Sequence, residues 1–337
     1  MIPLDRSREA EFRALVDGKA KPPGALGKLE AVAIRLALIA DSPTPRTDRA
    51  RLYVFAGDHG LNQAGVSAYP SEVTAAMVAT LLAGKASANA FARAVGAEVR
   101  IVDAGVAADL SHPDLIDAKI ARGTRNAAEE PALTTAEVEQ ALARGAGFAT
   151  AAAAEGIELL AIGEMGIGNT ASAALILHRL APAPLADCIG LGAGHDAEGL
   201  ARKRAVLARA AARAHPLEPL DVLAEFGGLE IAMMAGMVLG AAEARVPILV
   251  DGFIAGAAAL AAIRMSPGAA EVCFFAHRSA ERGHTILLEA LGADPLLDLD
   301  LRLGEGTGAL LAVPLIRAAC GLIGEVASLD DVLQGRI

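Results

Sequence analysis

Short apolar runs alternate with longer alanine-rich segments along most of the chain. Five runs of β-branched and aliphatic residues, at 51–56, 98–102, 157–162, 246–250 and 271–275, each lead into small or polar residues. The segments between them, such as 73–94 and 135–154, carry apolar residues at helical spacing. Strands that alternate with helices predict βαβ units and a parallel sheet. We expect a sixth strand near residues 187–191, which gives a sheet of about six strands flanked by helices.

The two ends of the chain depart from this alternation. Residues 1–48 predict two helices on either side of a Lys-Pro-Pro-Gly turn, and residues 310–323 predict another helix. We therefore predict an α/β protein with two domains. A large α/β domain covers residues 49–289, and a small helical domain is built from residues 1–48 and 290–337.

Composition narrows the class of protein. Hydrophobic residues make up 54% and charged residues 21% of the 337 residues, which is typical of a globular chain. The net charge of -10, with no basic tract, argues against nucleic acid as a partner. The apolar stretches 231–242 and 252–263 are too short to cross a bilayer, so we expect buried helices and no membrane partner. Three widely spaced cysteines and a charged N-terminus without an apolar signal core favour a cytoplasmic location.

A glycine-rich loop, Gly163-Glu164-Met165-Gly166-Ile167-Gly168-Asn169-Thr170, stands between a predicted strand and a predicted helix. Glycines let a ligand approach the backbone, and the first amides of a helix point outward unpaired. This geometry accepts a phosphate or carboxylate. Glu164 is unusual there, because a loop built only for anions would avoid it. The alternative is an ordinary strand-to-helix turn.

Four of the five predicted strands end in Asp, Glu or His beside glycine. Parallel strands bring their carboxyl ends to one edge of the sheet, where ligands of open α/β sheets bind. The pattern predicts a site at that edge. The alternative is that Asp and Gly are simply common in turns.

Two more glycine-rich segments carry candidate chemistry. In residues 301–308, Glu305 stands among three glycines before an apolar helix, where it can act as a general base or merely complement the helix dipole. Residues 190–196 are glycine-rich and precede a helix that carries Lys203, which can bind phosphate or remain a solvated charge. The dinucleotide fingerprint GxGxxG is not met there.

Metal and hydrolase chemistry have little support in the sequence. None of the seven histidines forms a compact metal-ligand spacing. Asp58, His59 and His277 at strand ends are an alternative metal site, but we predict none. No serine stands in a GxSxG pattern, so a hydrolase nucleophile elbow is not expected.

Read together, seven segments resemble the nicotinate-nucleotide–dimethylbenzimidazole phosphoribosyltransferase family, whose motifs occur here in the same order over nearly the whole chain. They are KPPGALGKLE (21–30), GDHGLNQAGVSAYPSEVT (57–74), GEMGIGNT (163–170), EGLARKR (198–204), GGLEIAMMAG (227–236), DGFIAGAAAL (251–260) and LRLGEGTGA (301–309). The resemblance implies a Rossmann-like large domain and a homodimer. It also implies an active site at the strand ends that the neighbouring subunit completes.

The resemblance implies that phosphoribose moves from nicotinate mononucleotide to a benzimidazole base, giving α-ribazole 5'-phosphate for the lower ligand of cobalamin. Glu305 would take the proton of the attacking base, and Glu164 would stabilise an oxocarbenium-like ribose. The nucleotide phosphate and ribose would contact Gly166, Gly168, Asn169, Thr170, Gly192, Gly194 and Lys203. The walls of the base pocket would be Ser67, Tyr69, Pro70, Met77 and Leu303. The reaction needs no metal and no organic cofactor.

The chain departs from the family pattern at several positions. They are Ala25, Ala79, Thr80, Lys85, Leu191, Ala193 and His195. Loss of polar groups near the pocket leaves open a paralogue that uses another base or a phenol. A non-catalytic nucleotide-binding protein and a nucleotide-dependent oxidoreductase also remain open. The sequence does not fix the preferred acceptor, the rate or the effect of these departures.

Overall fold

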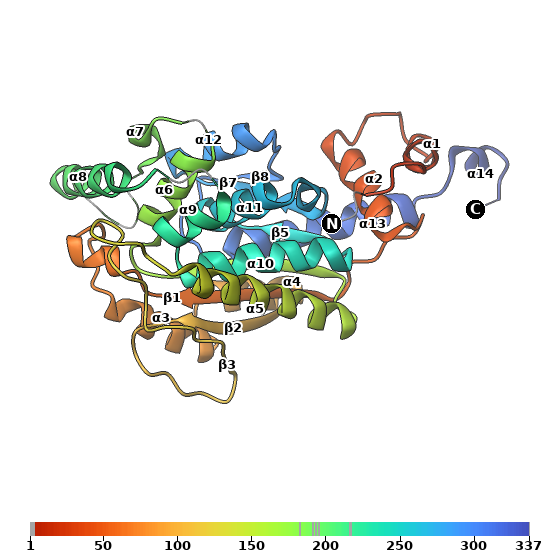
Figure 1. Cartoon of the computed structure of the whole chain (residues 1–337). Coiled ribbons are helices and arrows are strands. Elements are labelled where there is room, and N and C mark those ends of the chain that lie inside the picture. Colours follow the sequence, from red (N-terminus) through yellow and green to blue (C-terminus); the bar gives the residue numbers. More distant parts are fainter. Residues whose placement is uncertain are drawn as a thin grey trace.

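The computed structural model describes residues 4–181, 183–190, 192, 194, 196–215 and 218–336, and its centre is a parallel sheet (Figure 1). The sheet has six strands in the order β3-β2-β1-β4-β5-β6, and every neighbouring pair is parallel. The strands are β1 (Ala50–Gly57), β2 (Glu98–Gly105), β3 (Leu115–Asp117), β4 (Leu159–Met165), β5 (Ile248–Val250) and β6 (Cys273–Phe275). The predicted α/β fold with a parallel sheet of about six strands is therefore confirmed.

The sixth strand is not where the sequence analysis expected it. Residues 185–188 form the short helix α7 (Leu185–Cys188), and Leu191 lies outside the described residues. Pro184 caps that helix, and Ala and Asp favour strands poorly, so the local sequence supports a helix there. The sixth strand is β3, a three-residue edge strand on β2.

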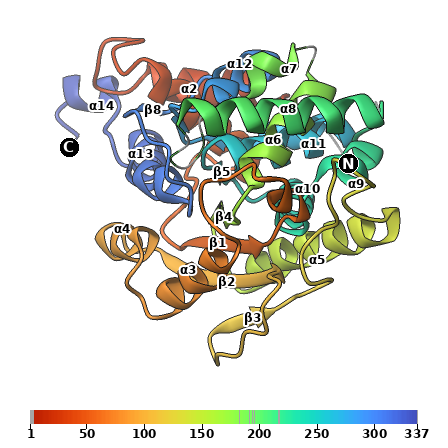
Figure 2. The same cartoon turned by 90° about the vertical axis from the view of Figure 1, so that its left-hand side faces the viewer.

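The central strands are buried on both sides, as parallel strands covered by helices must be. All eight residues of β1 are buried. Figure 2 shows α5, α10 and α11 on one face of the sheet and α3, α4 and α13 on the other. Their bounds are α3 (Glu72–Leu82), α4 (Ser87–Val95), α5 (Thr135–Ala154), α10 (Leu229–Ala244), α11 (Phe253–Met265) and α13 (Thr307–Gly324).

Shorter helices surround this three-layer core. They are α6 (Asn169–Leu180), α8 (Ala197–Arg213), α9 (Pro219–Phe226), α12 (Arg282–Leu291) and the 3-10 turns η1 (Gly60–Ala64) and η2 (Pro267–Val272). Two further short strands, β7 (His277–Arg278) and β8 (Leu297–Asp298), pair in parallel beyond β6. The predicted helix over 73–94 is two helices, because the chain turns at Gly84, whose φ is +71°.

The two ends of the chain meet at one end of the molecule (Figure 1). There α1 (Glu9–Asp17) packs on α2 (Lys28–Ala40), and α2 packs on α13. A backbone bridge joins Lys19 to Ser328, just before α14 (Leu329–Leu333). The division into domains at 48/49 and 289/290 stays a prediction, and residues 297–298 lie beside β7 rather than among these helices.

Two segments have the length and hydropathy of a membrane span, residues 72–95 and Thr307–Gly324. The first is interrupted by the turn between α3 and α4. The second, α13, buries Leu310, Val313 and Ile316 completely. The apolar character of α13 is therefore explained by the core that it helps to form.

The order in which the chain adds strands to the sheet changes side between β1 and β4. From β1 the chain adds β2 and β3 on one side and then crosses to β4 on the other. At such a switch point the loops after the two strands diverge and leave a crevice at their carboxyl ends. The glycine-rich loop at residues 163–170 spans the end of β4 and the start of α6, and the Gly-Asp-His-Gly segment at 57–60 begins with the last residue of β1.

Candidate functional site

The loop after β4 lies directly against the loop after β1. A Cβ atom on Gly166 would sit 2.4 Å from the Gly57 carbonyl oxygen, so only glycine allows this approach. The amide of Ile167 donates to the Thr74 hydroxyl at 3.1 Å, and Gly168 caps α6 with φ +95°. The first residues of α6, Asn169 and Thr170, are thereby held at the crevice.

A second glycine turn faces the first and presents Glu305. Gly304, Glu305 and Gly306 all have positive φ, at +90°, +60° and +81°. The Glu305 amide donates to the Glu164 carbonyl at 3.2 Å, and a Cβ on Gly163 would lie 2.2 Å from the Gly306 nitrogen. Glu164, near the end of β4, and the turn that carries Glu305 therefore touch through their backbones.

Asp251, at the end of β5, fixes the Glu305 turn. Its carboxylate accepts from the Gly306 amide at 3.1 Å and from the Ala309 amide at 3.0 Å. These bonds satisfy two of the free amides at the start of α13. They also hold Glu305 in its left-handed backbone conformation, which an L-residue rarely adopts.

The Glu305 carboxylate is buried beside the start of α4. Its side chain is buried, and it accepts from the Ala88 amide at 3.2 Å in the first turn of α4. Burial raises the pKa of the Glu305 carboxyl, the Ala88 amide partly opposes this, and the charge of Asp251 adds to the increase. A carboxylate whose pKa lies above its usual range is a better general base near neutral pH.

Glu164 is the most strongly perturbed acid of the site. It is 6% exposed and accepts a bond from the Asn169 side chain. Burial raises its pKa to about 8, against the effect of the Asn169 bond, and the charges of Asp251, Glu230 and Glu305 raise it further. Such a concentration of carboxylates creates a site that favours a positively charged ligand.

A buried cation, Lys203, lies beside the start of α6. Lys203 on α8 is 1% exposed, and its ammonium donates to the Thr170 hydroxyl at 2.9 Å and to the Gly190 carbonyl at 3.3 Å. Burial lowers the pKa of Lys203 to about 8, and the nearby charge of Glu281 opposes that decrease. A buried ammonium beside the first turn of α6 is suited to an anion such as phosphate.

A cavity of about 370 Å³ is lined by both glutamates and by Thr170, the partner of Lys203. Nine residues predicted from the sequence line it: Tyr69, Met77, Glu164, Gly166, Asn169, Thr170, Gly192, Leu303 and Glu305. Five others do not line it: Ser67, Pro70, Gly168, Gly194 and Lys203. Lys203 reaches the cavity wall through Thr170, and a Cβ on Gly194 would lie 3.8 Å from the Tyr69 hydroxyl. Ser67 accepts from the Tyr69 amide, so it shapes the loop behind the wall.

The cavity also has lining residues that the sequence analysis did not assign to it. Asp251, Ser279 and Glu281 are buried polar examples, and Met165 and Phe253 add apolar surface. Asp251 follows a predicted strand, so the strand-end rule alone could have included it. Ser279 and Glu281 follow the short strand β7, for which the sequence carries no clear signal.

The departures from the family pattern lie in two groups. Leu191, Ala193 and His195 are outside the described residues. Ala25, Ala79, Thr80 and Lys85 are described and do not line the cavity. These four changes therefore do not alter its wall directly.

The alternative metal site is not formed by the described residues. No group of three or more His, Cys, Asp or Glu in that part of the chain could hold a metal ion. His59 bonds to Glu230 and Ser172, whereas His277 lies 3.6 Å from Asp251 in a different cluster.

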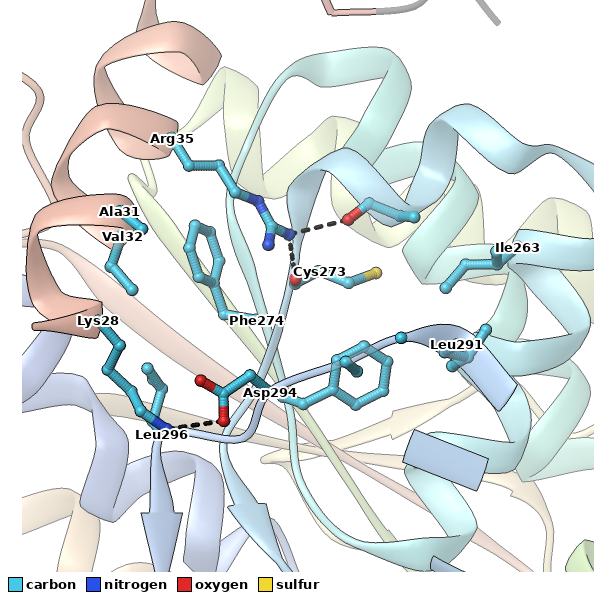
Figure 3. A pocket seen from close by; sticks show the side chains of 14 residues that line it. Lys28, Ala31, Val32, Arg35, Ile263, Cys273, Phe274, Leu291, Asp294 and Leu296 are labelled. Carbon is cyan, nitrogen blue, oxygen red and sulfur yellow. Dashed lines mark hydrogen bonds and ion pairs between the residues drawn. The ribbon is translucent and has the colours of Figure 1, made fainter. Parts of the chain in front are cut away.

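A second cavity of about 360 Å³ lies between α2 and β6, away from these residues (Figure 3). Its charged side chains Arg35, Lys28 and Asp294 form hydrogen bonds or ion pairs within the protein. Arg35 donates to the backbone carbonyls of Ala270 and Glu271 and stacks over the Phe274 ring, and Lys28 pairs with Asp294. These contacts tie α2 to the sheet edge, so we assign no chemistry to this cavity.

Comparison with known proteins agrees with this geometry. The sequence profile of a phosphoribosyltransferase family matches residues 1–332. Nicotinate-nucleotide--dimethylbenzimidazole phosphoribosyltransferases of Ralstonia nicotianae and Cupriavidus necator are 55% and 53% identical, over 96% and 97% of this chain and 93% and 95% of theirs. The crystal structure of CobT from Thermus thermophilus is similar with a TM-score of 0.93 at 47% identity, covering 96% of this chain and 98% of that one.

Proposed function

Because the chain belongs to this phosphoribosyltransferase family along nearly its whole length, we propose that it transfers phosphoribose from nicotinate mononucleotide to 5,6-dimethylbenzimidazole. The products are α-ribazole 5'-phosphate and nicotinate, for the lower-ligand nucleotide of cobalamin. One observation carries the proposal: a single cavity is lined by two buried glutamates, and a buried lysine lies behind its wall at Thr170. These groups match a transfer that needs one carboxylate near the ribose cation, one near the acceptor proton and an ammonium near the phosphate.

The leaving group needs little help from the protein. The glycosidic nitrogen of nicotinate mononucleotide is a pyridinium, so breaking its bond to C1 leaves an uncharged ring nitrogen and requires no general acid. Positive charge then develops on the ribose. Glu164, once ionised beside this cation, stabilises that charge in a buried site where electrostatic interactions are strong.

The acceptor needs a base. One benzimidazole nitrogen attacks C1 from the face opposite nicotinate, which inverts C1 from β to α. The proton on the other ring nitrogen becomes acidic as the new bond forms, and the Glu305 carboxylate takes it. Tyr69, Met77 and Leu303 supply the apolar surface against which the flat base would lie. Ser67 and Pro70 would support this wall from the loop behind it.

The phosphate would bind beside the start of α6. The first amides of α6 and the glycine-rich segment with Gly192 and Gly194 would contact it, and Lys203 would supply the counter-charge. Gly166, Gly168, Asn169 and Thr170 would hold the ribose and phosphate through the loop backbone. No metal or organic cofactor takes part in any of these steps.

Glu305→Gln tests the central assignment. Gln keeps the size of the side chain but cannot accept the proton, so we expect kcat to fall at least ~100-fold, within the range ascribed to general bases. The dissociation constant of nicotinate mononucleotide should change less than about threefold, since Glu305 is proposed to contact the acceptor and not the nucleotide. Turnover at the wild-type rate would remove Glu305 from the mechanism.

A panel of acceptors tests the substrate. Wild-type protein is incubated with nicotinate mononucleotide and benzimidazoles, purines or phenols, and products are read by mass spectrometry. The proposal expects α-ribazole phosphate with 5,6-dimethylbenzimidazole. Products only with phenols would indicate a paralogue, and nucleotide binding without nicotinate release from any acceptor would indicate a non-catalytic protein.

We also propose a cytoplasmic homodimer in which the partner completes the site. Large apolar side chains are exposed beside the cavity, at Tyr69 and Leu303, and among the terminal helices, at Leu26, Leu329 and Leu333. Exposed apolar surface of this kind is typical of an interface. Sedimentation equilibrium should give twice the 34.2 kDa chain mass. The three cysteines are free thiols, as a reducing compartment favours.

A further inference from the structure

A buried cluster of Ser172, His59 and Glu230 lies directly behind the loop at residues 163–170. His59 Nδ1 is 2.9 Å from the Ser172 hydroxyl, and His59 Nε2 is 2.5 Å from Glu230 Oε1. The three residues come from different elements: the loop after β1, the first turn of α6 and the first turn of α10. The imidazole therefore joins three segments that are far apart in the sequence.

The arrangement has the partners of a serine–histidine–acid triad but no access to substrate. Ser172 is 1% exposed, His59 2% and Glu230 0%, and none of the three lines the cavity. A nucleophile must touch the atom that it attacks. Any effect of the cluster on the reaction must therefore pass through the groups packed against it.

Those groups belong to the proposed nucleotide site. Ser172 is two residues after Thr170 in the same helical turn. A Cβ on Gly166 would lie 3.4 Å from Glu230 Oε1, and one on Gly57 would lie 2.7 Å from Glu230 Oε2. Glu230 thus fills the space behind both loops at the switch point, and His59 sets the position of its carboxylate.

The contact between His59 and Glu230 is buried on both sides. Burial opposes the charged imidazole, but the charge of Glu230 and their hydrogen bond outweigh it and raise the pKa of His59. Glu230 Oε2 has no hydrogen-bond partner among the described residues. Removing His59 would leave the carboxylate buried and unpaired, which is strongly unfavourable.

We propose that His59 and Glu230 are positioning residues for the nucleotide half of the reaction. With Ser172 they hold the loop at residues 163–170, so that Glu164 and Thr170 meet the ribose and phosphate in reactive geometry. The proposal rests on the phosphoribosyl transfer proposed above. Small displacements of such groups reduce rates by up to ~100-fold, because reacting atoms must be held within narrow limits.

The test separates the two bonds of His59. Glu230→Gln and His59→Asn disrupt the contact with Glu230, whereas His59→Gln can keep a donor near the Nε2 position. We expect kcat/KM for nicotinate mononucleotide to fall ~10- to 100-fold in the first two variants and less than about fivefold in His59→Gln. KM for the benzimidazole should stay within about threefold of wild type.

A matched control is His178→Gln, which changes a histidine at the far end of the same helix α6, where Nδ1 bonds to the Ala183 carbonyl. It should leave both kcat/KM values unchanged. Ser172→Ala removes a single hydroxyl and is the smallest of these changes. It tests the inference if the other variants fold poorly. It should lower kcat/KM for the nucleotide ~2- to 5-fold, with a far-UV spectrum like that of wild type.

Two outcomes overturn the inference. One is a set of variants that lose thermal stability but keep wild-type kinetics per folded site, which would make the cluster purely structural. The other is a loss confined to KM for the benzimidazole. The wild-type assay is run first, because failure to release nicotinate there would refute the proposed function and not this inference.

Discussion

Replacing Glu164 by Gln should stabilise the unliganded protein, and increasingly so as the pH rises. The carboxyl is buried among other acids, which raises its pKa from 4.5 to about 8. In the unfolded chain the group ionises near 4.5, whereas in the folded protein it keeps its proton to higher pH. Between these two values the folded state binds more protons, so its stability falls with increasing pH.

The magnitude follows from the same values. One pKa unit corresponds to ~1.4 kcal/mol, so by pH 8 the ionisable Glu164 should lower the free energy of unfolding by roughly 4 kcal/mol relative to a neutral side chain. Most of that change, about 3 kcal/mol, should develop between pH 5 and pH 8. Gln keeps an oxygen that can accept the bond from Asn169, so the variant isolates the charge.

Urea unfolding of both proteins at pH 5, 6, 7 and 8 measures the difference. The chain has no Trp and 2 Tyr, so unfolding is best followed by far-UV circular dichroism. All samples share one protein concentration, because association would shift apparent stability. Glu139→Gln, at an exposed position on α5, is the control and should show no pH-dependent difference. A Glu164→Gln difference that is equally flat from pH 5 to pH 8 would refute the reasoning.

Three further outcomes follow from the site. Lys203→Met should raise KM for nicotinate mononucleotide ~100-fold and leave KM for the base nearly unchanged, since the proposed role of the lost ammonium is to bind the phosphate. Gly163→Ala should lower the free energy of unfolding by ~2 kcal/mol and abolish turnover, because its Cβ would meet the Gly306 nitrogen. The control Gly147→Ala has open space around the added Cβ and should be tolerated. Full activity in EDTA is expected, and a loss that added divalent cations restore would contradict the metal-free mechanism.

Much of the sheet could be predicted because buried parallel strands leave a strong local signal. The runs at 52–56 and 159–162 are continuously apolar, as burial on both faces of a parallel sheet requires. The edge strand β3 was missed because it has only three residues, Leu115 and Ile116 are half-buried, and Asp117 is exposed. A short, half-exposed edge strand carries neither a continuous apolar run nor a long alternation.

The candidate site was also only partly predictable from the sequence. Glycine loops after strands can be recognised locally, so Glu164 and Glu305 could be singled out before the fold was known. What sets their chemistry could not, because it depends on contacts between distant segments. The Glu305 carboxylate meets the Ala88 amide across 217 positions, and His59 meets Glu230 across 171.

The helix α13 links the terminal helices to the turn that carries Glu305. It begins two residues after Glu305 and runs for 18 residues, roughly 27 Å, to the terminal helices, where it packs on α2. Asp251 anchors the start of this helix, and Pro314 in its interior removes one backbone hydrogen bond, so a shift at its far end can reach the Glu305 turn through a helix that bends at a defined place. Sequence changes among the chain termini can therefore tune the enzyme without altering a single residue of its cavity.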